Sequence, residues 1–135
     1  DEFYESEQYN FDPKTEKWKT KFNPENYKAK NFSEEVIDAK TGEVVIKLGD
    51  KINFLSAKKL ANDGLKDILV SRESLFGKFL HRDVKVNEEE DGVFKIGTEL
   101  NDTIIQQILD VNIHTLQISV TNSINKGPYL YLQLF

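Results

Sequence analysis

The stretch "TGEVVIKLGDKIN", residues 41–53, has the pattern of a hairpin turn, a short strand, a glycine and the start of a helix. A second stretch, "DGVFKIGTELN" at residues 91–101, has the same order of features in different letters. An Asp-Gly pair is itself a strong signal for a hairpin turn. A pattern that occurs twice predicts an internal duplication, and this duplication decides the fold.

A shift of 48 positions, the distance from Gly49 to Gly97, aligns the two copies. Apolar residues then align at six further positions: Val36 with Val84, Ile52 with Leu100, Leu60 with Ile108, Leu65 with Ile113, Ile68 with Leu116 and Val70 with Ile118. One copy alone has too little surface to cover its helix stripe and its small sheet face. Two copies can pack together and bury both faces.

Both copies carry the same signals for the start and the end of a helix. Asn53 and Asn101 are good N-cap residues, whose side chains can accept a hydrogen bond from the free N–H groups of a first helical turn. Gly64 and Asn112 are the residue types that best tolerate the left-handed conformation after a helix end. The predicted helices, of about three turns each, are residues 54–63 and 102–111.

Short strands surround each predicted helix. Two strands joined by a glycine-containing turn precede the helix, and a third follows it at residues 67–71 in the first copy and 115–120 in the second. Each unit therefore reads strand–strand–helix–strand. The expected fold class is α+β, with two tandem β-β-α-β repeats, an N-terminal β-hairpin, and small mixed sheets each packed by a short helix.

The N-terminal part is predicted to form the hairpin. In residues 17–22, Trp, Thr and Phe alternate with lysines, which is the period of a half-buried strand. This strand is expected to pair with residues 9–11 across a turn at residues 12–15. The region from Lys14 to Lys30 holds six lysines. We interpret them as a solvated strand face, with a phosphate-binding patch as the alternative.

Composition excludes several classes of function. The chain has 135 residues, 39% of them hydrophobic and 30% charged, which is typical of a folded domain. Its net charge of -5 argues against a free-standing binder of nucleic acid or anionic membranes. No stretch approaches the roughly 18 consecutive apolar residues of a membrane span. The chain has no cysteine, so disulfides and thiolate metal sites are excluded. This composition fits a cytoplasmic protein.

The two ends suggest a piece of a longer protein. The chain contains no methionine, and it finishes in the apolar run "GPYLYLQLF". A bare strand with this sequence would be an exposed edge prone to aggregation. We therefore expect an excised segment.

No group of residues forms a recognisable active site. His81 and His114 have no partner at metal-ligand spacing, so both are expected at the surface or in turns. The acidic run "EEED", residues 88–91, lacks the spaced oxygen ligands of a calcium loop and is expected to be a solvated loop tip. The glycines form no phosphate-binding motif, and the serines lie in no nucleophile elbow. The sequence thus predicts no catalytic, cofactor-binding or metal-ligating residue.

Several motifs in order resemble one protein family. "VIDAKTGEVVIKLGDKIN", "LFGKFLHRDV", "TELNDTIIQQILDVNIHTLQI" and "TNSINKGPYL" resemble the beta subunit of bacterial DNA-directed RNA polymerase, in particular the lineage-specific insertion in its second lobe. The matching residues are Asp38, Thr41, Gly42, Glu43, Gly49, Gly64, Leu75, Gly77, Leu80, Gly127, Pro128 and Tyr129, with Trp18, Phe22, Pro24, Glu25 and Tyr27 in the lead-in. The second hairpin and the last six residues depart from the family pattern.

The resemblance implies a division into four parts. They are residues 1–33 as a lead-in hairpin from the parent lobe, 34–74 as the first repeat, 75–121 as the second repeat, and 122–135 as a return strand toward the lobe. The parent enzyme transfers nucleotidyl groups from nucleoside triphosphates onto RNA under the direction of a DNA template. Its magnesium is held by aspartates of the partner subunit, so this segment is implied to be non-catalytic and without a cofactor.

The resemblance also implies partners and a location. The lobe borders the downstream DNA channel, so the segment is expected to be a peripheral structural or factor-interaction module in the cytoplasm. Its implied partners are the other polymerase subunits and transcription factors of the secondary channel, with weak or no DNA binding by the isolated segment. Two alternatives remain open. One is a free-standing protein-binding adaptor without enzymatic activity, and the other is a small hydrolase that uses the histidines or the acidic run.

Overall fold

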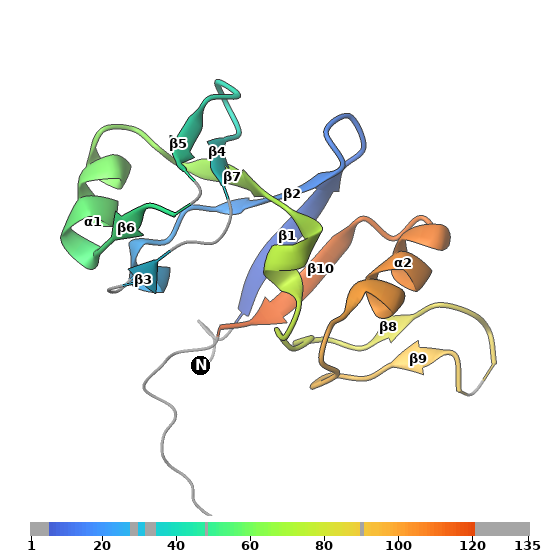
Figure 1. The fold of residues 1–135 in the computed structure, drawn as a ribbon. Helices are drawn as coiled ribbons and strands as arrows, with labels where there is room; N and C mark the ends of the chain where they lie inside the picture. The colour runs from blue at the N-terminus through green and yellow to red at the C-terminus, as the bar shows by residue number, and fades with distance from the viewer. Residues whose placement is uncertain (1–5, 28–29, 32–34, 48, 90, 121–135) are drawn as a thin grey trace, which may run out of the picture.

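The computed structural model describes residues 6–27, 30–31, 35–47, 49–89 and 91–120. Within these residues the chain forms two α-helices, two short 3-10 helices and ten strands (Figure 1). In chain order these are β1 (Ser6–Asp12), β2 (Lys17–Lys21), η2 (Pro24–Asn26), β3 (Lys30–Asn31), β4 (Val36–Asp38), β5 (Val44–Ile46), β6 (Lys51–Ile52), α1 (Phe54–Asn62), β7 (Asp67–Val70), η3 (Arg72–Leu75), β8 (Val84–Lys85), β9 (Val93–Phe94), α2 (Asp102–Asp110) and β10 (Thr115–Ser119). The α+β class is confirmed.

The main sheet has six strands in the order β10-β1-β2-β7-β4-β5. The hairpin β1–β2 lies in its middle, and each hairpin strand pairs with the strand that follows one of the helices. β10 pairs with β1, and β7 pairs with β2. The hairpin is therefore the junction of the two predicted repeats, and α1 and α2 lie toward opposite ends of the molecule (Figure 1).

The hairpin forms where the alternation predicts it. Trp18 and Thr20 on β2 are buried, while Lys19 and Lys21, which alternate with them, are exposed. Asp12 closes the turn, because its carboxylate accepts hydrogen bonds from the Lys14 N–H at 3.1 Å and from the Thr15 hydroxyl at 2.9 Å. The predicted hairpin and its turn are confirmed.

The helix boundaries also follow the sequence signals. The Asn53 side chain accepts a hydrogen bond from the N–H of Ser56 at 2.8 Å, and the Asn101 side chain accepts one from Ile104 at 2.9 Å. Both N-caps are confirmed. The residues predicted to end the helices, Gly64 and Asn112, have the positive φ values of 114° and 62°.

Loss of either N-cap is expected to destabilise the fold. Asn53→Ala and Asn101→Ala each leave an N–H group of a first helical turn without its partner, which costs about 1 kcal/mol. The measurement is urea unfolding followed by circular dichroism. Asn→Asp at the same positions keeps an acceptor oxygen and serves as the control, with an unchanged midpoint. Equal losses in the Ala and Asp variants would contradict the capping role.

The expectation of small mixed sheets, one per repeat, is wrong. Every strand pair that the structure describes is antiparallel. One sheet includes strands of both predicted repeats, residues 34–74 and 75–121, which are called the first and the second half below. The reason is the choice of neighbour for β7. It pairs with β4, the first strand of its unit, and β4 is antiparallel to both β5 and β7. A parallel pair would have required β7 to lie beside β5.

The second half departs from the strand pairing of the first. β8 and β9 form a separate two-stranded sheet, and β3 and β6 form another. The outer neighbour of β10 is the connecting segment at residues 79–81, where Leu80 forms a bridge with Ile118. The His81 N–H donates to the Gln117 carbonyl at 2.8 Å, and the Ser119 N–H donates to the Phe79 carbonyl at 2.8 Å. This segment occupies the edge that β8 would need.

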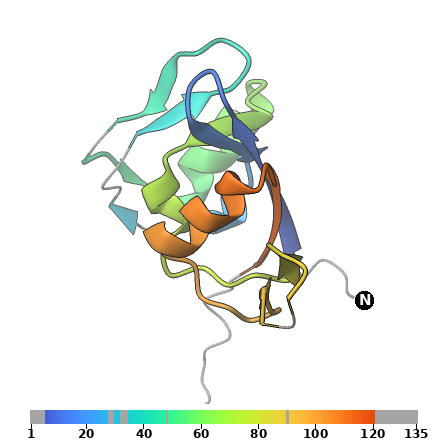
Figure 2. The same ribbon diagram turned by 90° about the vertical axis from the view of Figure 1, so that its right-hand side faces the viewer.

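A single hydrophobic core connects the halves. It includes side chains of the hairpin, both helices and the connecting segment: Tyr9, Trp18, Val36, Ile46, Ala57, Ile68, Leu80, Ile105, Ile108, Leu116 and Ile118. In Figure 2, α2 faces the viewer with β10 beside it. The predicted repeats thus share one core. The domain boundaries stay a prediction, and the predicted return strand at residues 122–135 lies outside the described residues.

Candidate functional site

The two histidines occupy separate positions. His81 Nδ1 lies 3.1 Å from the hydroxyl oxygen of Ser119, near the end of β10. His114 precedes β10, and its ring packs against Phe11 with 5.5 Å between the centroids. In the described part of the chain, neither ring has a hydrogen bond to a carboxylate. Their contacts are those of residues that hold β10 in place.

The acidic run is part of a tight turn, although Glu90 lies outside the described residues. The Asn87 side chain accepts a hydrogen bond from the Glu89 N–H at 2.8 Å, and the Gly92 N–H donates to the Glu89 carbonyl at 2.9 Å. A Cβ at Gly92 would require the Asn87 side chain to move. Glu88 pairs with the Lys85 ammonium at 3.2 Å on the surface. Among the described residues, no three His, Asp or Glu side chains could hold a metal ion.

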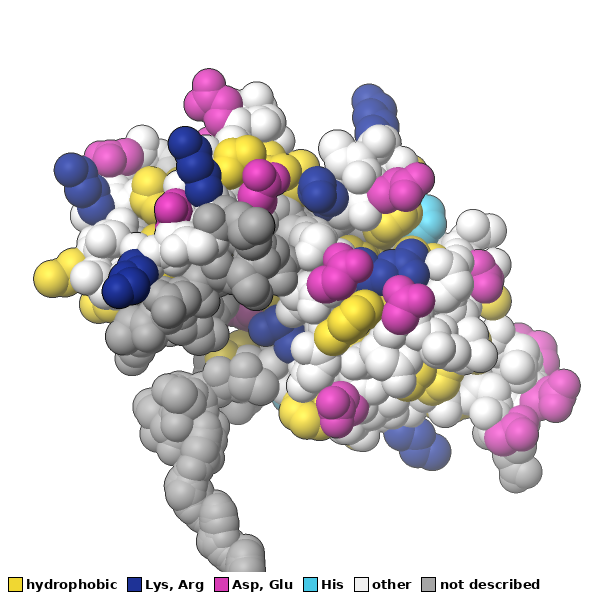
Figure 3. All heavy atoms as spheres, viewed as in Figure 1, with side chains coloured by type: hydrophobic (Ala, Val, Ile, Leu, Met, Phe, Trp, Pro, Cys, Tyr) yellow, Lys and Arg dark blue, Asp and Glu magenta, His cyan; other side chains and the backbone are white. Residues whose placement is uncertain are grey.

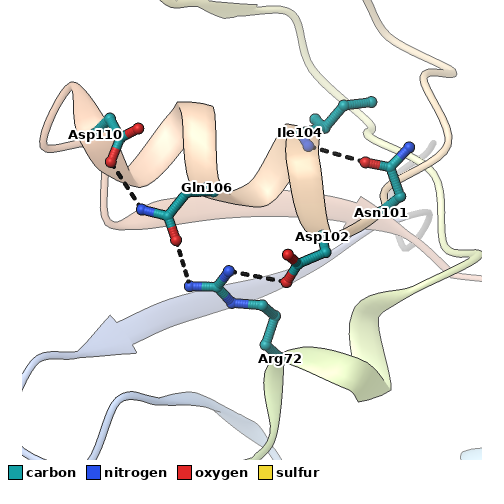
Figure 4. A network of polar contacts seen from close by, with 6 residues as sticks. All are labelled: Arg72, Asn101, Asp102, Ile104, Gln106 and Asp110. Carbon is teal, nitrogen blue, oxygen red and sulfur yellow. Dashed lines mark hydrogen bonds and ion pairs between the residues drawn. The ribbon is translucent and has the colours of Figure 1, made fainter.

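Arg72 connects the two halves through polar contacts. Figure 4 shows its guanidinium reaching from η3 to α2, where it pairs with the Asp102 carboxylate at 3.0 Å and donates to the Gln106 carbonyl oxygen at 3.0 Å. The Gln106 amide in turn donates to the Asp110 carboxylate at 2.7 Å. The network holds the segment after β7 against the helix of the second half.

Charged side chains of both signs are distributed over the face drawn in Figure 3. A surface that binds the nucleic-acid backbone requires a continuous field of basic side chains. No such field covers the face drawn in Figure 3. Among the residues that the structure describes, no helix has the length and hydrophobicity to cross a membrane.

A cleft of about 540 Å³ lies between β1 and β2. The two strands diverge from their shared turn (Figure 1), and their pairing register ends at Asn10 and Lys19. Beyond that pair the Thr20 hydroxyl donates to the Gln8 carbonyl at 2.9 Å, in the place of a backbone hydrogen bond. The lining residues are Ser6, Glu7, Gln8, Asn10, Lys19, Thr20, Lys21, Phe22, Asn23 and Asp67. We define this feature as the β1–β2 cleft.

A carboxylate is fixed in the wall of this cleft. The Glu7 side chain accepts hydrogen bonds from the side-chain amides of Asn23 and Asn26, each at 3.2 Å. Behind it lies Tyr9, which is 5% exposed. Burial, with the Glu7 charge and Tyr27 as smaller causes, raises the pKa of the Tyr9 phenol well above its usual value.

The Tyr9 phenol is expected to make the fold sensitive to alkali. An unfolded tyrosine ionises near pH 10, whereas the pKa of folded Tyr9 is raised. Its contribution to stability is therefore complete below about pH 10 and is lost as the pH rises further. Tyr9→Phe should show a smaller loss of unfolding free energy between about pH 10 and 11 than the unchanged chain, as measured by urea titration. Identical losses in the two proteins would rule out this role.

The sequence did not reveal the β1–β2 cleft. The sequence predicts a solvated face for the lysines of β2, and two of them, Lys19 and Lys21, line the cleft. The signal that was available is Thr20, a polar residue at a buried position of an otherwise apolar alternation. No local sequence pattern marks Glu7 as a cleft residue, because its hydrogen-bond partners Asn23 and Asn26 are brought next to it only by the fold.

The first and last strands of the described fold are neighbours. β1 and β10 are antiparallel, and Ser6 at the start of β1 is the register partner of Ser119 at the end of β10. The Ser6 hydroxyl also lies 3.4 Å from the Gln117 amide oxygen. The two ends of the described fold thus lie side by side.

Comparisons with known proteins give consistent matches. The chain is 34% identical over 122 residues to DNA-directed RNA polymerase subunit beta of Rickettsia felis and of Rickettsia conorii, with 90% of this chain and 9% of each relative covered. It is 33% identical over 133 residues to the same subunit of Rickettsia prowazekii, with 98% of this chain and 10% of the relative covered. No protein-family model matches. The chain spans about a tenth of the length of these curated relatives.

Proposed function

Since this chain is homologous to one segment of DNA-directed RNA polymerase subunit beta, we propose that it acts as a non-catalytic module inserted in that subunit. The activity of the whole enzyme would be DNA-templated synthesis of RNA from nucleoside triphosphates. The module would support assembly with the other subunits and offer a surface to transcription factors of the secondary channel, in the cytoplasm. It would contribute no reacting group.

The pairing of β1 with β10 carries this proposal. A domain can be inserted in a longer chain when its first and last residues lie close together, because the host fold then needs only a small gap. Ser6 and Ser119 are opposite each other in an antiparallel pair, so the two connections to a host would leave side by side. The single core shared by both halves supports a module that folds as one body.

The resemblance implies magnesium in the whole enzyme, held by a different subunit. Among the described residues, no group of three His, Asp or Glu side chains could hold a metal ion. Duplex DNA is expected to bind the isolated chain weakly at physiological salt, because its net charge is -5.

Excision from the complete subunit tests the proposed function. The segment between Ser6 and Ser119 would be replaced by a two-residue Asn-Gly turn, which suits an antiparallel pair. The polymerase with the shortened subunit is expected to assemble and to keep basal RNA synthesis in an in vitro transcription assay. Its response to secondary-channel factors is expected to fall. Loss of nucleotide addition by a fully assembled enzyme would refute a non-catalytic role.

A further inference from the structure

We propose that the groove between the β8–β9 hairpin and α2 binds an arginine side chain of a partner polypeptide, together with the apolar residue beside it. The groove has a volume of about 480 Å³, within the range of specific binding pockets. Its lining residues fall between positions 86 and 94 of the hairpin and between 107 and 111 at the end of α2. We define this feature as the hairpin–helix groove. The inference does not rest on the proposed function, and its test on this chain alone is separate from the excision experiment.

Apolar side chains form one part of the lining. Val86 and Phe94 are half-buried and pack against the hydrophobic core, so their positions are fixed from behind. Val111 follows the last turn of α2 and is 41% exposed. A ligand that lays a hydrocarbon stem along these side chains removes apolar surface from water, which favours binding.

The charged side chains among the described lining residues are acidic: Glu89, Asp91 and Asp110. Figure 3 shows acidic side chains gathered at the lower right, over the β8–β9 hairpin. The ion pair described in this hairpin joins Lys85 to Glu88, and both residues lie outside the lining. A groove with this charge attracts a cation and repels nucleic acid.

The end of α2 adds to the negative charge. The C-terminus of a helix carries a partial negative charge, which basic residues in the last turn commonly offset. The last turn of α2 contains no basic residue and does contain Asp110. A cationic side chain from a partner would therefore be stabilised at this helix end as well as by the carboxylates.

The acidic wall is held in place before any ligand binds. The Asn87 side chain accepts a hydrogen bond from the Glu89 N–H at 2.8 Å and so fixes the hairpin tip. The Gln106 amide donates to one oxygen of the Asp110 carboxylate at 2.7 Å, and the other oxygen can accept from a ligand. A preformed wall lowers the entropic cost of binding.

Arginine matches both parts of the lining. Its aliphatic stem suits the apolar side chains, and its planar guanidinium donates two parallel hydrogen bonds to a carboxylate and stacks on aromatic rings such as that of Phe94. A lysine ammonium is a point charge that offers no such planar fork. A metal ion is less suitable, since no three His, Asp or Glu side chains of the described residues are placed to hold one.

Heteronuclear NMR of the isotope-labelled full chain tests the site. The probe is the peptide acetyl-Gly-Ser-Leu-Arg-Leu-Ser-Gly-amide, and its titration gives both the location of binding and the Kd. Saturable shifts are expected for the backbone N–H signals of Gly92, Phe94 and Val111, which line the groove. Absence of saturable shifts at these residues would overturn the proposal.

Paired charge variants test the role of the carboxylates. Asp91→Asn combined with Asp110→Asn keeps the shape of the side chains and removes two charges, so it is expected to weaken binding about fivefold. Glu43→Gln combined with Asp63→Asn is the matched control. It removes two exposed charges from the first half and should leave the Kd within about twofold. Equal losses in the two double variants would contradict binding in the groove.

Three further peptides separate the possible explanations. Citrulline in place of arginine keeps the size and removes the charge, and it is expected to weaken binding at least about fivefold. Serine in place of both leucines is expected to weaken binding about threefold, because apolar contact is lost. Unchanged binding of either peptide would overturn the proposal. Equal binding of a peptide with lysine in place of arginine would also overturn it, because the groove would then be a general cation surface.

Discussion

Trp18→Ala is expected to destabilise the whole chain by about 3–5 kcal/mol, a large part of the roughly 5–15 kcal/mol typical of a domain. Trp18 is 0% exposed and lies at the centre of the main sheet. It is the register partner of Phe11 on β1 and of Val70 on β7, so its removal opens a cavity between the two halves. Its ring centroid lies 5.3 Å from that of Phe11, and this contact is lost too.

Urea unfolding measured by far-ultraviolet circular dichroism provides the test. Trp18→Phe is the matched control, because it keeps an aromatic ring in the same place. It also removes an indole N–H that is buried without a hydrogen-bond partner, so its cost is expected to stay near 1 kcal/mol. A loss for Trp18→Ala that does not exceed the loss for Trp18→Phe would show that the junction is not packed as described.

Leu80→Ala is expected to cost about 2–5 kcal/mol, the range for a fully buried leucine. Leu80 is 0% exposed and lies in the segment between the halves. Its backbone contacts both β10 and the turn at residues 97–98: it bridges Ile118, its N–H donates to the Thr98 carbonyl at 2.9 Å, and its carbonyl accepts from the Gly97 N–H at 2.7 Å. Leu80→Ala keeps these main-chain contacts but leaves a cavity in the core beside β10.

The same variant tests whether the halves unfold together. Trp18, the only tryptophan, reports from the hairpin by its fluorescence, whereas circular dichroism reports from the helices of both halves. Because the core is shared, the two signals are expected to change at the same urea concentration in Leu80→Ala. Phe79→Ala, at a neighbouring residue that is 38% exposed, should cost less than about 1 kcal/mol. Separate transitions would indicate two independent repeats.

Local features could be predicted from the sequence because they depend on neighbouring residues. The caps at Asn53 and Asn101 and the turn at Asp12 each involve hydrogen bonds that span two or three positions. The helices consequently lie where the spacing placed them, with the same offset of 48 positions between Phe54–Asn62 and Asp102–Asp110. The polar types of these residues determine both geometries directly.

Strand pairing could not be predicted because it depends on competition between distant segments. Residues 79–81 and β8 compete for pairing with the outer edge of β10. The burial of Leu80 favours residues 79–81. The central place of the hairpin was missed for the same reason, since no local pattern tells which strand joins its outer edges. The β1–β2 cleft is still harder to predict from the sequence, because it exists only where two paired strands separate beyond Asn10 and Lys19.

The pairing of β1 with β10 has a consequence for synthesis of the chain. The Ser6 and Gln117 side chains that meet in this pair are 111 residues apart in the sequence. At a translation rate of about 5–20 residues per second, β1 waits roughly 5–20 seconds for its neighbour to be made. During this interval its open edge is available to other nascent chains. The polar side chains of Gln8 and Asn10 keep that waiting strand hydrophilic, which reduces the danger of misassembly on the ribosome.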